Sequence, residues 1–119
     1  MRIAPACWIA LLISVAWVSA AGSQDQGNAD TGKAVFLADG CFECHGRVGE
    51  GGFFNYPVPA LAQVRLPLEA FKAIVRLGPN DMPAYSPAVL SDAELADIYA
   101  YLRSLPGARP VQEVPLLHD

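Results

Sequence analysis

Two cysteines and a histidine lie within five consecutive residues, and this motif constrains the fold more than any other feature of the chain. Cys41 and Cys44 are separated by two residues, and His45 follows directly. If the stretch is helical, Cys41, Cys44 and His45 occupy positions i, i+3 and i+4 on one face. The C-x-x-C-H spacing is the attachment pattern for c-type haem, with a thioether at each sulfur and the histidine as proximal iron ligand. The sequence therefore predicts one covalent haem, bound through Cys41 and Cys44.

Other uses of the two cysteines fit the chain less well. A disulfide across two intervening residues closes a very small loop and stabilises little. A thioredoxin-like redox pair requires βαβ patterning around it, which the chain lacks. A zinc site requires four ligands, and besides Cys41, Cys44 and His45 the obvious fourth is His118, the remaining histidine. The direct adjacency of Cys44 and His45 is also awkward for binding one tetrahedral ion.

The first 21 residues have the layout of a secretory signal peptide. Arg2 is followed by an apolar run over residues 6–18 and by the small residues Ser19, Ala20 and Ala21. We expect cleavage after Ala20 or Ala21 and a periplasmic location. An uncleaved membrane anchor is the less favoured alternative, because the run is shorter than the ~20 residues of a spanning helix.

Removal of residues 1–21 would leave an acidic domain with few lysines. It removes Arg2 and no acidic residue, leaving seven basic and twelve acidic side chains, a net charge of −5. Lys33 and Lys72 are the lysines of the chain. This balance excludes the basic patch of a nucleic-acid-binding protein.

The remaining pattern predicts an all-α domain over residues 30–107, after a flexible lead-in at 22–29 and before an extended tail at 108–119. Asp30 or Thr31 is expected to cap a first helix that runs through residues 33–38 towards the motif. Glycines and prolines predict a loop from Gly46 to Gln63.

Two more helices are expected after this loop. Pro67 suits the first turn of a helix whose apolar stripe is Leu68, Phe71, Ile74, Val75 and Leu77. Ser91 and Glu94 form a capping box at the start of the last helix, which Pro106 ends. We therefore expect three main helices, with long loops wrapped around the haem.

Met82 is the candidate for the second axial ligand. It lies with Pro83 in the loop before the last helix, and a thioether ligand opposite histidine raises the reduction potential of haem iron. His118 is the competing candidate, but it lies at the end of the tail, where order is least expected.

This order of elements resembles the class I, monohaem cytochrome c family over about residues 30–105. The resemblance implies that Gly32 and Phe36 on the first helix pack against Tyr101 on the last. It also implies that the Pro59 carbonyl accepts a hydrogen bond from the proximal histidine, with Pro57 as the alternative. The segment from Gly46 to Leu105 is more loosely similar to small cytochromes that accompany periplasmic dehydrogenases.

Three further groups are weaker candidates. Arg65 is a candidate for binding a haem propionate, because guanidinium suits carboxylate recognition. Tyr85 is expected to line the methionine side of the haem pocket. Phe53, Phe54 and Tyr56 form an aromatic cluster that either packs on the haem or belongs to a partner surface.

The function implied is electron transfer rather than catalysis on a substrate. We expect a carrier, or the cytochrome subunit of an oxidoreductase, that accepts electrons from a periplasmic dehydrogenase and passes them to a cytochrome or oxidase. The lysine ring by which familiar members of the family dock is missing, which favours a dedicated partner. The alternative is a haem enzyme or gas sensor with an open or labile sixth iron position.

Overall fold

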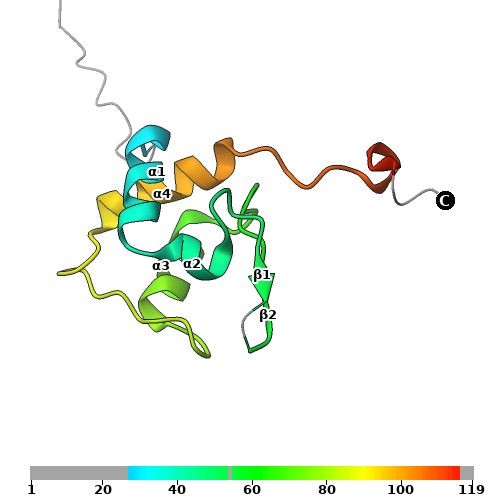
Figure 1. The fold of residues 1–119 in the computed structure, drawn as a ribbon. Helices are drawn as coiled ribbons and strands as arrows, with labels where there is room; N and C mark the ends of the chain where they lie inside the picture. Colours follow the sequence, from blue (N-terminus) through cyan, green and yellow to red (C-terminus); the bar gives the residue numbers. More distant parts are fainter. Residues whose placement is uncertain (1–26, 54, 116–119) are drawn as a thin grey trace, which may run out of the picture.

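The computed structural model describes residues 27–53 and 55–115, and the described chain is predominantly helical (Figure 1). Its elements in order are α1 (Ala29–Ala38), α2 (Cys41–His45), β1 (Gly52–Phe53), β2 (Pro57–Val58), α3 (Leu68–Leu77), α4 (Asp92–Ser104) and the 3-10 turn η1 (Val111–Glu113). The expected all-α class is confirmed. The predicted signal segment at 1–21, and His118, lie outside the described residues. Within the described ranges, no helix is both long and apolar enough to cross a membrane.

The crossing of α1 over α4 is the main contact of the fold, and it depends on the absence of a side chain at Gly32. A Cβ placed on Gly32 would overlap the backbone carbonyl of Asp97 in α4. Next to this contact the rings of Phe36 and Tyr101 lie 5.6 Å apart at 57°, a favourable tilted aromatic pair. The packing implied for Gly32, Phe36 and Tyr101 is therefore confirmed.

The hydrophobic core lies between α1, α3 and α4. Its buried apolar side chains are Phe36, Phe71, Val75, Leu90, Leu95, Ile98, Tyr101, Leu102 and Leu105. The stripe predicted on α3 is divided: Phe71 and Val75 are buried, whereas Ile74 and Leu77 are 39% and 73% exposed. Leu77 thus remains largely uncovered by protein, and Ile74 remains partly so.

Both ends of α4 are capped. The predicted capping box is present, because the Ser91 side chain accepts from the Glu94 N–H while the Glu94 carboxylate accepts from the Ser91 N–H. At the other end, Gln63 donates its backbone N–H to the Leu102 carbonyl (2.9 Å) and its side-chain amide to the carbonyl of Leu105. Gln63 adopts the left-handed backbone conformation (φ 60°) in making these contacts, which satisfy carbonyls that the helix end leaves unpaired.

The structure corrects three local predictions. The cap of α1 is Asn28, whose side chain accepts from the Thr31 N–H at 2.9 Å, so the helix begins before the predicted Asp30 or Thr31. Asp30 instead lies in the first turn, where its charge favours the helix dipole. The loop from Gly46 to Gln63 contains the short β1–β2 hairpin. The tail is not wholly extended, since Pro110 leads into η1.

Gly32→Ala tests the helix crossing. The added methyl group has no room against the Asp97 carbonyl, so we expect a loss of about 2 kcal/mol in the free energy of unfolding, as for other overpacked sites. Denaturant unfolding of the haem-loaded protein measures it. Gly107→Ala is the matched control, because its Cβ would meet the flexible side chain of Gln63 at 3.3 Å. Equal stability of the two variants would contradict this account of the crossing.

The N-terminal cap of α4 depends on the ionised carboxylate of Glu94, so we expect it to weaken in acid. Hydrogen bonds from the N–H and hydroxyl of Ser91 hold the pKa of Glu94 below its usual 4.5. A carboxyl group whose pKa is lower in the folded state stabilises the fold at pH values above its pKa in the unfolded state. This stabilisation is lost as the pH falls through the pKa of the folded state. We expect the wild type to lose more stability than Glu94→Gln between about pH 6 and about pH 3. Parallel pH profiles of the two proteins would contradict this.

Candidate haem-binding site

The C-x-x-C-H motif forms its own short helix, α2, directly after α1. Gly40 separates the two helices by adopting the left-handed conformation (φ 74°), which glycine allows at little cost. Cys41, Cys44 and His45 therefore lie on one helical face, as their spacing predicts. Cys41 and His45 are half-buried, Cys44 is exposed, and the two thiols are not joined to each other.

The ring of His45 is oriented by a backbone carbonyl. Its Nδ1 lies 3.0 Å from the carbonyl oxygen of Pro59, fourteen residues along the chain. Because a carbonyl can only accept, Nδ1 carries the proton and donates it, which leaves the lone pair on Nε2 available. A histidine that binds a metal commonly has this second contact, which fixes the ring and strengthens it as a ligand.

The loop after α2 folds back on itself and so brings Pro59 to His45. The N–H of Gly51 donates to the His45 carbonyl at 2.8 Å, and the N–H of Leu61 donates to the Gly49 carbonyl at 2.7 Å. Gly51 has a φ of 81°, and a Cβ there would lie 2.8 Å from the Val58 carbonyl. The glycines that predicted a loop thus permit the close backbone approach that the histidine contact requires.

Met82 lies in the loop between α3 and α4, half-buried against the core cluster. Three residues later, Tyr85 anchors this loop at three points. Its N–H donates to the Val75 carbonyl (3.1 Å), its carbonyl accepts from Arg76 Nη1 (2.8 Å), and its hydroxyl donates to the Asp39 carbonyl (2.9 Å). Since Asp39 lies two residues before Cys41, these bonds tie the methionine loop to the start of the motif helix.

The Tyr85 hydroxyl remains a donor over a wide pH range. Burial, followed by the nearby Cys41 and Asp39, raises the pKa of Tyr85 above its usual 10. The phenol therefore stays protonated at neutral pH and keeps its bond to Asp39. Arg76, which sequence reasoning missed, strengthens the same region by donating also to the Leu90 carbonyl (2.7 Å) and pairing with Asp92.

The donor set and its surroundings fit a haem better than a zinc ion or a reactive thiol pair. Burial, with the charge of Asp39, raises the pKa of Cys41 to about 11, which disfavours the thiolate form that a redox pair requires. In the described part of the chain, no group of three or more His, Cys, Asp or Glu side chains is arranged to hold a metal ion. Ile74 and Leu77, one turn apart on α3, give an exposed apolar face that ends at the methionine loop.

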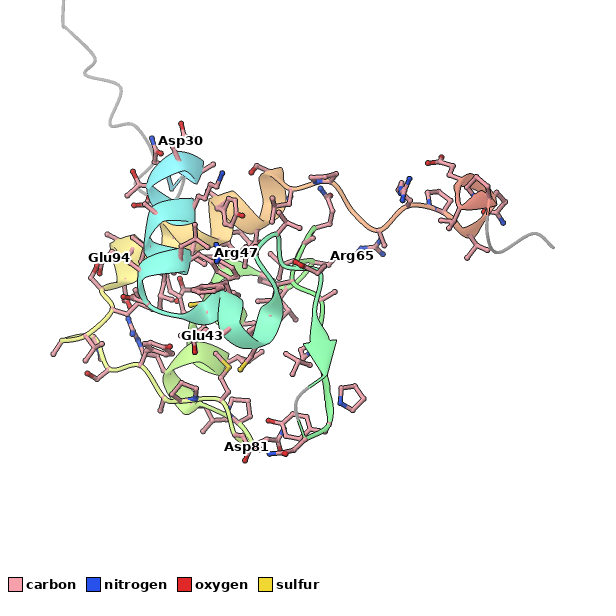
Figure 2. All side chains as sticks on the ribbon, in the orientation of Figure 1. Asp30, Glu43, Arg47, Arg65, Asp81 and Glu94 are labelled. Carbon is pink, nitrogen blue, oxygen red and sulfur yellow. The ribbon has the colours of Figure 1, made fainter. Side chains whose placement is uncertain are left out.

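Arg65 lies elsewhere, beside the end of α4 (Figure 2). Together with Arg103, Gln63 and Val64 it lines an open pocket of about 310 Å³. Its suggested contact with a haem propionate stays a prediction.

Tyr85→Phe tests the bond between the methionine loop and the motif helix. Loss of one hydroxyl bond to Asp39 should lower the free energy of unfolding by about 1 kcal/mol while leaving the haem attached. Urea unfolding followed by far-ultraviolet circular dichroism measures the change. A midpoint equal to that of the wild type would mean that this bond does not stabilise the fold.

Comparison with known proteins agrees with this fold. A family model described as cytochrome c oxidase, cbb3-type, subunit III matches residues 27–102, from the cap of α1 almost to the end of α4. No curated protein matches the chain.

Proposed function

The chain belongs to the cytochrome c oxidase, cbb3-type, subunit III family, and on this premise we propose that it is an exported one-electron carrier with a single c-type haem. The family is one of cytochrome c domains, which bind haem and transfer electrons. In this proposal Cys41 and Cys44 would hold the haem, and His45 and Met82 would bind its iron. The haem, when bound, supplies the one-electron couple, and the protein sets its potential through these ligands.

The hydrogen bond from His45 Nδ1 to the Pro59 carbonyl is the observation that carries the proposal. A histidine that binds iron needs a fixed ring orientation and one ring nitrogen with a free lone pair. Here the ring is held so that Nε2 is the available nitrogen, while both thiols lie on the same face of α2. The residues that would hold the porphyrin and the residue that would bind its iron are thus presented together.

Met82 is proposed as the ligand that closes the site on the opposite side. A thioether is a soft ligand that suits haem iron, and the loop that carries it is fixed to α3 and to the residue before Gly40. If His45 and Met82 both bind the iron in its two oxidation states, no position would open for a substrate. This supports a carrier rather than an enzyme.

The predicted signal segment supports export to the periplasm, and the family description supports partners that are redox proteins. We propose a periplasmic dehydrogenase as donor and a cytochrome or oxidase as acceptor. The protein would be attached to the membrane only if residues 1–21 are retained as an anchor. An acidic chain with two lysines suits a dedicated partner better than an acceptor that binds a ring of lysines.

Met82→Ala tests the axial ligation directly. The variant should retain its haem, because the thioethers and His45 are unchanged. Its reduction potential should fall by roughly 100 mV or more, within the ~0.8 V range that axial ligands span. Spectroelectrochemical titration measures the potential, and the near-infrared methionine-to-ferric-iron band, present in the wild type, should disappear.

An unchanged potential in Met82→Ala would show that another residue is the ligand. Binding of carbon monoxide by the ferrous wild type at neutral pH would instead favour the alternative, a sensor or enzyme with a labile sixth position. If the protein acquires no haem when it is expressed with c-type maturation factors, the proposal is overturned, including the interpretation of C-x-x-C-H as a haem-attachment motif.

A further inference from the structure

The loop that carries Met82 has a defined conformation from its first residue. Gly78 and Asn80 both adopt the left-handed backbone conformation, with φ of 60° and 56°. The Met82 N–H then donates to the Pro79 carbonyl at 3.1 Å, which closes a turn. Tyr85 anchors the end of the loop, as described above, but it lies three residues beyond Met82. A second contact fixes the chain on the other side of the methionine.

That second anchor comes from the tip of the β1–β2 hairpin. Asp81, directly before Met82, donates its backbone N–H to the Tyr56 hydroxyl oxygen at 3.0 Å. Its carboxylate accepts from the Asn55 side-chain amide at 3.2 Å. Figure 2 shows Asp81 at the end of its loop, next to the hairpin. We name these three residues, Asn55, Tyr56 and Asp81, the Asp81 clamp.

The clamp joins the two segments that carry the iron-binding contacts. The hairpin continues from Val58 into Pro59, whose carbonyl orients His45. Asp81 is one peptide bond from Met82. The hairpin therefore contacts the proximal histidine at its base and the methionine loop at its tip. Tyr56, which the sequence offered as part of an aromatic cluster, acts here through its hydroxyl.

We infer that Asn55 and Tyr56 are positioning residues for Met82, and that the clamp sets how readily the methionine yields the sixth iron position to another ligand. The inference rests on the proposed His45 and Met82 ligation. In this inference, displacement of Met82 moves its loop away from the hairpin, and this movement breaks both bonds to Asp81. The clamp thus lowers the affinity for any competing ligand by the free energy of those bonds.

Tyr56→Phe in the haem-loaded protein is the test, with imidazole binding to the ferric form as the probe. Loss of the acceptor for the Asp81 N–H should tighten imidazole binding roughly fivefold, the effect of one net hydrogen bond. Exchange of the Asp81 amide hydrogen should accelerate by a similar factor. Tyr99→Phe is the matched control, because its hydroxyl donates to the Leu66 carbonyl (2.7 Å), outside the clamp, and its imidazole affinity should stay that of the wild type.

A side-chain exchange gives a second and independent test, which also serves if Tyr56→Phe fails to fold. Asn55→Asp places two carboxylates together and should tighten imidazole binding. The double variant Asn55→Asp with Asp81→Asn restores a donor and an acceptor in reversed order, and should return the affinity towards that of the wild type.

The outcomes separate this inference from the proposed function. A wild type without the methionine-to-iron band would overturn the proposed ligation and the inference with it. A wild type with the band, but with imidazole affinity unchanged in both Tyr56→Phe and Asn55→Asp, would overturn the inference alone. Tightening that the reversed pair fails to correct would also overturn it, because the effect would not then arise from the Asn55–Asp81 bond.

Discussion

The hydrogen bond between His45 Nδ1 and the Pro59 carbonyl is the constraint around which the site is arranged. It requires the chain to leave α2, turn and return within fourteen residues, which explains the glycines at 49 and 51 and the short hairpin that follows. The same bond decides which ring nitrogen is available, so local backbone geometry selects the chemistry of the histidine. The fold of the loop thus determines the tautomer of His45.

A second level of organisation keeps this arrangement in place. The contact of Gly32 with α4 and the Phe36–Tyr101 pair hold α1 against α4, and α2 follows α1 after the turn at Gly40 (Figure 1). Met82 and Tyr85 of the methionine loop pack against the core, and hydrogen bonds from Tyr85 to Asp39 and from Asp81 to Tyr56 add to this packing. Hydrogen bonds between distant parts of the chain thus hold both the loop of His45 and the loop of Met82.

The sequence predicted what depends on local pattern. The motif, the Ser91–Glu94 capping box and the class of fold follow from spacing within a few residues, and the family resemblance added the packing of Gly32 on α4. Sequence reasoning chose the wrong cap for α1, because Asn28, Asp30 and Thr31 are all competent capping residues. It also missed the hairpin, since two-residue strands are too short for an alternating pattern. The bond between Tyr56 and Asp81 spans 25 residues and has no sequence signature.

The polar contacts that hold the methionine loop differ in strength from the packing of the core. Truncation of a buried core side chain costs about 2–5 kcal/mol, so the core resists change more than any single polar contact does. Bonds at half-buried or exposed positions, such as those of Asp81, contribute about 1 kcal/mol each and are easily altered by one residue. A substitution at Asp81 can therefore alter how the loop of Met82 is held without removing a side chain from the core of Phe36, Leu95 and Leu102. The core residues, which determine whether the chain folds, are thus distinct from the polar residues that hold the tip of this loop.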